Sequence, residues 1–365
     1  MANILEDFSN SIDPRTSLFD VKIDSETNGT LKLSGRVLDH PQLDELPRLF
    51  PAHSLDTAAI RILSAETHER VHVRTNLTGL YEKPTFGMAL SSELTYGTDL
   101  DVLDAQGKWV FTRQRDGYLG WAYRTYLSEG TAVTPTHLVL GPSIELRLEP
   151  DETSGILTRL VSGTGVVCNG FINGSGNGRT DGLTTDGSTT DENGGTDGLP
   201  TDENGGTDGF SGWVQVRANQ SGWVQSRHLR ALRDVPKALE EKRATLIQDF
   251  QRMIGIPYLW GGVSGNGIDC SGFARLLHRW VGVDIPRDAD MQHAAATPLE
   301  PPYEIGDLLF FAESDSRRKI SHVGVSLGGW MMVHSSRLRN GVYVDDLQER
   351  KDLMDIFVGA GSFLR

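Results

Sequence analysis

The sequence predicts an α+β protein of several domains, in which strand-rich segments precede a C-terminal unit of helices and strands. At 365 residues, the chain is long enough for two to four domains that each bury a core. Residues 55–127 and 136–232 consist of short apolar runs separated by turn residues, which is typical of small all-β domains. From residue 236 onward, stretches with helical periodicity precede several short strands.

Residues 1–52 are predicted to form a small α+β extension. Apolar residues alternate from Phe19 to Ile23, a turn follows, and a second strand runs toward Val37. The stretch HPQLDELPRLF then predicts a short helix. We expect a packing role for this extension, because nothing in it indicates chemistry.

The two strand-rich segments end in similar sequences, which indicates an internal repeat. GKWVFTRQRDGYLGWAYRTYL in the first corresponds to SGWVQVRANQSGWVQSRHL in the second, so that Trp121 matches Trp223. A repeat of this size predicts two copies of one small barrel. The expected boundaries are residues 53–130 and 134–233.

A long insertion interrupts the second copy at about residues 169–212. It is almost free of large apolar residues and contains an eleven-residue repeat, TDENGGTDGL and then TDENGGTDGF. Such a composition cannot bury enough surface to offset the entropy lost on ordering, which predicts a disordered loop. A calcium-binding turn is the alternative, although the acidic residues match no complete EF-hand pattern.

The helix predicted after the glycine-rich loop at residues 261–267 carries the strongest chemical signal. Its apolar residues follow the i, i+3, i+4, i+7 spacing of one buried face. Asp269 occupies the expected N-cap, which puts Cys270 in the first turn, where free N–H groups and the helix dipole favour a negative charge. The pKa of a thiol is lowered at such a position, and the thiolate is the nucleophile. We therefore expect Cys270 to be an activated nucleophile and Cys168 to be a buried apolar side chain.

Two downstream histidines are candidates for the base. His322 lies in ISHVGVSLG, where it alternates with apolar residues, and His334 follows the apolar run WMMV. The turn at Gly328 and Gly329 predicts that the two strands pair as a hairpin with the histidines side by side. A nucleophile, a base and a group that orients the base are the parts of covalent catalysis. The sequence lacks the close-spaced ligands of a zinc site, so neither a metal nor another cofactor is expected.

Six motifs in the last third of the chain point to a family: PYLWGG, DCSGF, IPRDADMQ, GDLLFF, ISHVGVSLG and VHSS. In order and spacing they resemble the catalytic domain of NlpC-type papain-like cysteine peptidases, expected here at residues 236–365. The resemblance implies Cys270 as nucleophile, His322 as general base and His334 as the orienting residue. It also implies that Tyr258 lies against the nucleophile, where it could help to bind an oxyanion. Each predicted barrel resembles a bacterial SH3-like domain.

The same resemblance implies a substrate. These enzymes cleave bacterial cell-wall peptides, typically between γ-D-glutamyl and a diamino acid. In members that recycle muropeptides, a tyrosine of the first SH3-like domain and the aspartate before the nucleophile bind the free amine of the substrate, and Tyr118 and Asp269 match these positions. Ser271 could hold the γ-glutamyl carboxylate. An acidic residue of the first SH3-like domain is also expected at the amine, with Glu82 and Glu93 as open alternatives.

The IPRDADMQ motif has two further features. Ala289 stands where the family commonly has serine, which removes one hydroxyl that could contact the substrate. Arg287 is expected to form a structural salt bridge rather than to contact the substrate.

The expected function is a cytoplasmic γ-D-glutamyl-L-diamino acid endopeptidase that acts on free muropeptides. A net charge of −14 argues against nucleic acid or an anionic membrane as partner. Two distant cysteines suit a reducing compartment, and the beginning MANILEDFSNSID lacks the basic and apolar regions of a secretory signal. A secreted wall hydrolase and a non-catalytic wall-binding protein are the alternatives, and an acyltransferase would share the first half-reaction. The sequence does not predict the diamino acid or the oligomeric state.

Overall fold

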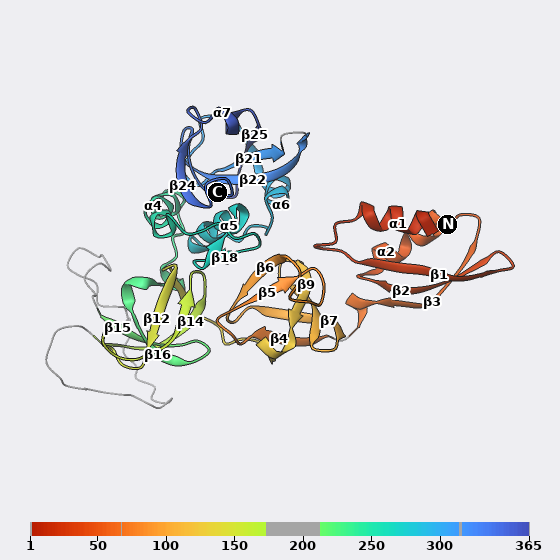
Figure 1. The fold of residues 1–365 in the computed structure, drawn as a ribbon, viewed down its shortest axis with the longest axis horizontal. Helices are drawn as coiled ribbons and strands as arrows, with labels where there is room; N and C mark the ends of the chain where they lie inside the picture. The colour runs from red at the N-terminus through yellow and green to blue at the C-terminus, as the bar shows by residue number, and fades with distance from the viewer. Residues whose placement is uncertain (1, 67, 173–211, 314–315, 365) are drawn as a thin grey trace, which may run out of the picture.

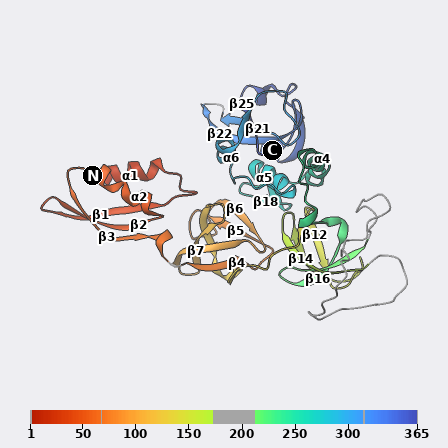
Figure 2. The same ribbon diagram turned by 180° about the vertical axis from the view of Figure 1, so that it is seen from behind.

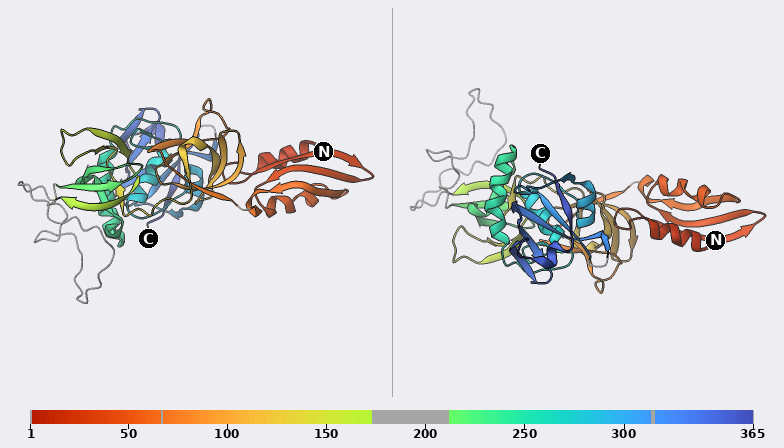
Figure 3. Two further views of the ribbon diagram at one scale, coloured as in Figure 1. Left: turned by 90° about the horizontal axis from the view of Figure 1, so that it is seen from below. Right: turned by 90° about the horizontal axis from the view of Figure 1, so that it is seen from above.

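The computed structural model describes residues 2–66, 68–172, 212–313 and 316–364, which form four units in chain order (Figure 1). A small N-terminal unit precedes two strand-rich units of similar build, and a unit of helices and strands ends the chain. Figures 1 and 2 show the C-terminal unit lying across both strand-rich units, and Figure 3 shows the N-terminal unit extending to one side. The predicted strand-rich α+β class is confirmed. No helix among the described residues is long and apolar enough to cross a membrane.

The N-terminal unit is a three-stranded sheet with helices against it. Its elements are α1 (Ala2–Ser11), β1 (Phe19–Thr27), β2 (Thr30–Val37), α2 (His40–Asp44), α3 (Leu46–Leu49) and β3 (Ser54–Ile62). β1 and β2 form a hairpin that turns at Asn28 and Gly29, both with positive φ, as this type of two-residue turn requires. The two predicted strands and the predicted short helix are present, the helix as α2 and α3.

The extent of the N-terminal unit differs from the prediction. β3 pairs in parallel with β2, with α2 and α3 as the crossover between them, so residues 54–62 belong to this sheet and not to the following unit. The boundary expected at residue 52 therefore lies about ten residues too early. Alternation in SLDTAAIRI indicates a strand but not the sheet that the strand joins.

The two strand-rich units are called the first barrel (residues 63–129) and the second barrel (residues 137–234). The first consists of the 3₁₀ turn Leu63–Ala65, β4 (Glu69–Val73), β5 (Leu77–Tyr81), β6 (Leu90–Thr95), β7 (Asp99–Gln106), β8 (Trp109–Gln114), β9 (Leu119–Tyr123), the 3₁₀ turn Arg124–Tyr126 and β10 (Leu127–Glu129). The second consists of β11 (His137–Val139), β12 (Ser143–Arg147), β13 (Ile156–Val161), β14 (Gly165–Ile172), β15 (Trp213–Arg217), β16 (Ser221–Gln225), the 3₁₀ turn Ser226–His228, β17 (Leu229–Ala231) and the 3₁₀ turn Leu232–Asp234.

The strand orders of the two barrels are the same. The first sheet runs β6-β5-β9-β8-β7-β4-β10 and the second runs β13-β12-β16-β15-β14-β11-β17, with each strand at the place of its counterpart. The predicted repeat is thus confirmed in the topology. Of the predicted insertion, residues 169–172 end β14, and residues 173–211 lie outside the described residues.

The C-terminal unit packs helices against a six-stranded sheet. Its helical elements are α4 (Leu239–Asp249), the 3₁₀ turn Phe250–Met253, α5 (Cys270–Trp280), α6 (Ala289–Ala295) and α7 (Lys351–Met354). Its strands are β18 (Val263–Ser264), β19 (Gly267–Ile268), β20 (Thr297–Leu299), β21 (Leu308–Glu313), β22 (Ser316–Gly328), β23 (Met331–Ser336), β24 (Gly341–Asp346) and β25 (Phe357–Ser362). The sheet order is β20-β25-β21-β22-β23-β24, and α5 packs against β22 and β23. Phe273 and Trp280 of α5 bury its apolar face in this core.

Candidate active site

Cys270 is the first residue of α5, and the residue before it caps the helix. Asp269 Oδ1 accepts a hydrogen bond from the Gly272 backbone N–H at 2.7 Å, which is the N-cap that the sequence predicts. Phe273 and Leu277 anchor the opposite face of α5 in the core. Cys270 is buried, with 6% of the residue exposed, and its sulfur accepts a hydrogen bond from the Val323 backbone of β22.

The surroundings of the Cys270 thiol favour its protonated form. Burial raises the pKa of the thiol to about 12, and the charge of Asp269 acts in the same direction. Hydrogen bonds from the Val323 and Ser271 backbones lower the pKa by less. The expectation of an easily ionised thiol is therefore wrong for the substrate-free site, because the pattern shows a helix start but not its burial. A base must take the thiol proton during any reaction.

Two histidines from neighbouring strands provide that base. His322 on β22 and His334 on β23 belong to the predicted antiparallel hairpin, and His322 precedes the residue that contacts the Cys270 sulfur. His322 Nε2 lies 2.7 Å from His334 Nδ1, and His334 Nε2 lies 2.8 Å from Asp345 Oδ2. Because a carboxylate only accepts, His334 Nε2 donates to Asp345, and Nδ1 of a neutral His334 is an acceptor. His322 Nε2 then carries its proton, which leaves Nδ1 of His322 as the basic nitrogen.

Two arginines fix the carboxylate at the end of this series. Arg339 Nη1 donates to Asp345 Oδ1 and Arg350 Nη1 donates to Oδ2, both at 2.8 Å. Burial acts to raise the pKa of Asp345, but the hydrogen bond to His334 and the arginine charges outweigh burial, and the pKa is lowered. Asp345 therefore remains an acceptor that fixes the tautomer of His334.

The thiol of Cys270 and the imidazole of His322 are both uncharged in the substrate-free site. Burial lowers the pKa of His322 to about 3, and the neighbouring His334 acts in the same direction. A protonated thiol and a neutral imidazole form an uncharged pair, so proton transfer accompanies attack on a substrate. This arrangement can perform covalent acyl transfer. Among the residues that the structure describes, no group of three or more His, Cys, Asp or Glu side chains is placed to hold a metal ion.

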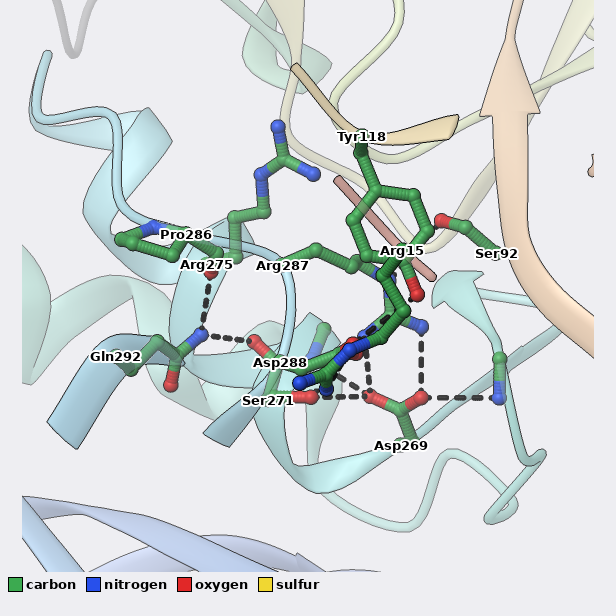
Figure 4. A network of polar contacts seen from close by, with 12 residues as sticks. Arg15, Ser92, Tyr118, Asp269, Ser271, Arg275, Pro286, Arg287, Asp288 and Gln292 are labelled. Carbon is green, nitrogen blue, oxygen red and sulfur yellow. Dashed lines mark hydrogen bonds and ion pairs between the residues drawn. The ribbon is translucent and has the colours of Figure 1, made fainter. Parts of the chain in front are cut away.

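A buried ion pair holds Asp269, the residue that precedes the cysteine (Figure 4). Arg287 donates to Asp269 through Nη2 at 2.7 Å and through Nη1 at 3.1 Å, and the arginine side chain is 1% exposed. Nη1 also donates to Ser271 Oγ, and Nε donates to Ser92 Oγ of the first barrel, both at 3.0 Å. The salt bridge expected for Arg287 is thus present, and it neutralises Asp269. The Ser271 hydroxyl is also engaged, because it donates to Asp269 Oδ1 at 3.2 Å.

Glu93 of β6 brings an acidic side chain of the first barrel to this site. Its Oε2 atom accepts hydrogen bonds from the Val263 N–H at 2.9 Å and from Ser264 Oγ at 3.0 Å, and the residue is 8% exposed. Burial raises the pKa of Glu93, although both hydrogen bonds and the charge of Arg287 oppose the rise. Glu82 instead is exposed in the connection between β5 and β6. Of the two acidic candidates, the geometry favours Glu93.

Tyr118, in the turn between β8 and β9, is linked to the site through Asp288. Its hydroxyl donates to Asp288 Oδ2 at 3.0 Å, and the same oxygen accepts a hydrogen bond from Arg15 Nη1 at 2.8 Å (Figure 4). Burial raises the pKa of Tyr118, and the charge of Asp288 acts in the same direction, so the phenol stays neutral and is a donor. Tyr118, Asp269 and Arg287 thus lie in one polar network built from three units of the chain.

Comparisons with known proteins agree with this geometry. Residues 255–355 match the model of the NlpC/P60 family, and residues 80–125 match that of the bacterial dipeptidyl-peptidase Sh3 domain. The C-terminal unit is an NlpC/P60 domain. The first barrel is accordingly a bacterial SH3 domain, as the resemblance in the sequence implies.

Two curated relatives and one solved structure are similar over different lengths. A γ-D-glutamyl-L-lysine dipeptidyl-peptidase of Bacillus subtilis (strain 168) is 40% identical over 126 residues, which cover 34% of this chain but only 42% of the relative. The protein of the same name from Bacillus cereus (strain ATCC 10987 / NRS 248) is 26% identical over 292 residues, or 75% of each chain. An NlpC/P60 family protein from Bacillus cereus ATCC 10987 superposes with a TM-score of 0.59 at 20% identity, covering 81% of this chain and all of that one, which shows the fold.

Tyr258 of the NlpC/P60 domain lies within electrostatic range of the nucleophile. Burial raises the pKa of Tyr258, and Cys270 and Asp269 act in the same direction. A neutral phenol beside the thiol is a hydrogen-bond donor that can stabilise a developing oxyanion.

Sequence reasoning missed three residues around the NlpC/P60 site. Asp345 lies in β24, two residues beyond Tyr343, which pairs with His334, so its place beside the histidines depends on strand pairing. Asp288 is the N-cap residue of α6, but its side chain makes no capping hydrogen bond and donors from Tyr118 and Arg15 bind it instead. Arg15 lies far away in the sequence and carries no local signal.

Proposed function

We propose that the protein is a cysteine endopeptidase that hydrolyses the bond between γ-D-glutamate and an L-diamino acid in peptidoglycan-derived peptides with a free N-terminal L-alanine. The observation that carries the proposal is the hydrogen-bonded series from Asp345 through His334 to His322, beside the buried Cys270 thiol. The names of the two Bacillus relatives support the substrate class, since both are called γ-D-glutamyl-L-lysine dipeptidyl-peptidases.

The reaction proceeds through a thioester. His322 Nδ1 takes the proton from Cys270 Sγ as the sulfur attacks the γ-glutamyl carbonyl carbon. The Cys270 backbone N–H and the Tyr258 hydroxyl stabilise the oxyanion. When the C–N bond breaks, protonated His322 gives its proton to the departing amine of the diamino acid. Water, deprotonated by His322, then attacks the thioester, which releases the γ-glutamyl acid and restores the thiol.

The orientation of His322 depends on the residues behind it. His334 accepts from His322 Nε2 and donates to Asp345, so only one tautomer of His322 satisfies both bonds. When His322 becomes an imidazolium during attack, the carboxylate of Asp345 stabilises the charge through His334. His334 is thus the orienting residue of the proposed catalytic triad.

The free amine of the substrate is recognised at the boundary with the first barrel. Glu93 is a buried carboxylate whose hydrogen-bond donors are the Val263 N–H and the Ser264 hydroxyl rather than an arginine. Arg287 neutralises Asp269, so we assign most of the attraction for an ammonium group to Glu93 and the accepting oxygen of Tyr118. Ser271 remains the proposed partner of the γ-glutamyl carboxylate, through its N–H group because its hydroxyl is engaged.

Recognition of a free amine favours released muropeptides as substrates. In the intact wall the alanine amine is acylated, carries no charge and cannot bind a carboxylate as an ammonium does. We therefore propose a role in muropeptide recycling in the cytoplasm, and cell fractionation followed by immunodetection tests this location.

The deciding experiment compares hydrolysis of L-Ala-γ-D-Glu-diaminopimelate, its L-lysine analogue and their N-acetylated forms. We expect cleavage of at least one free-amine peptide, which Cys270→Ala abolishes and Cys168→Ala, the matched control at the other cysteine, leaves intact. Equal cleavage of free and acetylated peptides would favour a wall hydrolase. No cleavage of any peptide, with peptide binding retained, would favour the non-catalytic alternative, and transfer to an added amine in place of water would indicate an acyltransferase.

A second arm tests the series behind the base. Asp345→Ala should lower kcat about ten-fold or more with little change in KM, because it removes the acceptor that fixes the histidine tautomers. Asp346→Ala, at the next residue, is the matched control. Equal activity of the two variants would show that Asp345 does not orient the base.

A further inference from the structure

The N-terminal unit places one arginine against the NlpC/P60 domain near the proposed binding site of the substrate amine (Figure 4). We call this region, around Tyr118, Asp288 and Glu93, the amine side. Arg15 lies in the turn between α1 and β1, where Asp13 of the same turn sets its guanidinium through hydrogen bonds from Nε at 2.9 Å and from Nη2 at 2.7 Å. Arg15 then donates through Nη1 to Asp288 Oδ2 at 2.8 Å and through Nη2 to Asp290 Oδ2 at 2.6 Å. Such charge-assisted bonds are short and directional. One preset side chain therefore joins the N-terminal unit to the start of α6.

The backbone of this turn is fixed to the first barrel as well. The carbonyl of Arg15 accepts a hydrogen bond from the Leu119 N–H at 2.7 Å, and Leu119 directly follows Tyr118. A backbone hydrogen bond thus joins the Arg15 turn to the residue after Tyr118, and side-chain hydrogen bonds join it to the start of α6.

Asp288 is where the contacts of Arg15 and Tyr118 meet. Its Oδ2 atom accepts from both side chains, while its own helix receives no capping hydrogen bond from it. An aspartate at an N-cap ordinarily accepts a bond from the N–H groups of that helix. Asp288 thus bonds to the two outside partners through Oδ2 instead of to α6, while Arg287 Nη1 lies 3.7 Å from its Oδ1.

We propose that Arg15 is a positioning residue that makes Tyr118 a fixed hydrogen-bond acceptor for the ammonium group of the substrate. This inference rests on the proposed function. The Tyr118 O–H donates to Asp288, so the lone pairs of the phenol oxygen are directed away from Asp288 and toward an incoming N–H donor. Without Arg15, the Asp288 carboxylate is free to turn and cap α6, and the Tyr118 hydroxyl then rotates and presents its proton to the ammonium group.

The charge of Arg15 does not repel an ammonium group. Asp13, Asp288 and Asp290 all contact its guanidinium at 2.6–2.8 Å, so three carboxylates surround one positive charge. The N-terminal unit therefore has a defined role in specificity, beyond the packing role that its sequence suggests.

The test is a double-mutant cycle read out on two substrates. Arg15→Met should lower kcat/KM for L-Ala-γ-D-Glu-diaminopimelate about ten-fold, mainly through KM, as expected for one hydrogen bond to a charged group. The residual rate on the N-acetylated peptide should stay the same. In a Tyr118→Phe background, Arg15→Met should have no further effect, because the two residues act in series. Arg15→Lys retains the positive charge but not the planar guanidinium with its several N–H donors, so it should give an intermediate loss of kcat/KM.

Arg275→Met is the matched control. It breaks another bond between units at the same turn, since Arg275 Nη2 donates to Asp116 Oδ2 at 2.7 Å, while Asp116 Oδ1 accepts from the Tyr118 backbone N–H. It removes neither partner of the bond between the Tyr118 hydroxyl and Asp288. An equal loss in this control, equal losses on both peptides or an additive double mutant would overturn the inference and leave the proposed function standing. If the wild-type protein does not cleave the free-amine peptide, and its Cys270→Ala variant does not bind L-Ala-γ-D-Glu in calorimetry, the proposed function fails and the inference fails with it.

Discussion

The first and second barrels share a strand order but meet the NlpC/P60 domain with different chemistry. The first barrel contributes polar groups: Ser92 accepts from the buried Arg287, Glu93 bonds to β18, and Tyr118 donates to Asp288. These side chains all lie on the amine side of the proposed active site. The first barrel is therefore part of the site.

The second barrel contributes packing on another side of the domain. Leu140 belongs to the same apolar core as α5, and Arg230 of β17 donates to the Trp280 carbonyl at 3.0 Å and to Asp249 at 2.7 Å. Trp280 is the last residue of α5, at the end opposite Cys270. The described part of the second barrel therefore supports the helix that carries the proposed nucleophile.

The difference between the barrels is local. Counted from the second Trp of each copy, Asp-Gly-Tyr at residues 116–118 corresponds to Ala-Asn-Gln at residues 218–220. The comparison teaches that two copies of one barrel can differ in role: one contributes side chains for substrate recognition and the other supports the catalytic domain. The difference depends on the side chains of one turn and one strand edge.

The glycine-rich loop of the NlpC/P60 domain explains how both barrels approach closely. A Cβ atom at Gly261 would lie 2.6 Å from Leu90 of the first barrel, and one at Gly265 would lie 2.1 Å from the carbonyl oxygen of Pro142 of the second. Glycine is thus needed at both positions for close contact, and at Gly261 also because the backbone has a positive φ of 77°.

The largest expected effect comes from the ion pair on the first-barrel side. Arg287→Met leaves Asp269 charged and buried, which should cost about 3–5 kcal/mol of stability. Arg230→Met, on the second-barrel side, should cost about 1 kcal/mol because Asp249 keeps a bond from Arg252 at 3.0 Å. Thermal unfolding of both variants measures the difference. Equal losses of stability in the two variants would show that the ion pair on the first-barrel side matters no more for folding than the contact of the second barrel.

A slightly smaller loss is expected at the apolar contact of the second barrel. Leu140→Ala removes a residue that is 3% exposed and should cost about 2–5 kcal/mol, depending on how far the core relaxes. The ratio of hydrolysis rates for free and N-acetylated peptides should not change below the melting temperature. A change in this ratio would show that the second barrel also contributes to specificity.

The sequence predicted the fold wherever the signal was local. Alternating apolar residues and the repeated W…GW pattern predict both barrels, and the helical spacing after Asp269 predicts α5. The partner of β3 was not predictable, because a parallel pair joined by a crossover depends on contacts between residues far apart in the sequence, such as Thr30 and Ser54. The short α1 was missed because its polar residues hide a weak apolar stripe.

The residues of the candidate site likewise divide into those with a local sequence signal and those without one. Cys270, His322 and His334 lie in motifs whose local pattern indicates chemistry. Arg15 and Asp345 act only through neighbours far away in the sequence, in an unremarkable turn and at the end of a strand. The pKa of the thiol was mispredicted for the same reason, since burial is a property of the fold.

Exchange of the turn residues should sharpen the comparison between the barrels. Tyr118→Gln gives the first barrel the residue at the same place in the second, Gln220, and removes the phenol oxygen proposed to accept from the ammonium, so kcat/KM for the free-amine peptide should fall about ten-fold. The reciprocal Gln220→Tyr, in the second barrel, should leave kcat/KM unchanged because Gln220 is exposed in the turn before β16. Steady-state kinetics on the free and N-acetylated peptides measures both, and a loss in Gln220→Tyr would contradict the assignment of roles.

The smallest effect is a pH dependence that belongs to the first barrel alone. Burial raises the pKa of Glu93, and the charged form is the one that attracts an ammonium group. As the pH falls through this raised pKa, Glu93 takes up a proton and KM for the free-amine peptide rises, while kcat stays the same. The acid limb of kcat/KM, displaced upward from the ordinary range of a glutamate, reports this group in the free enzyme. Glu93→Gln should flatten the acid limb, and the exposed Glu82→Gln should retain it. An acid limb that survives in Glu93→Gln would assign the titration to another group, and the amine would then be held by Tyr118 and Asp269 without a carboxylate from the barrel.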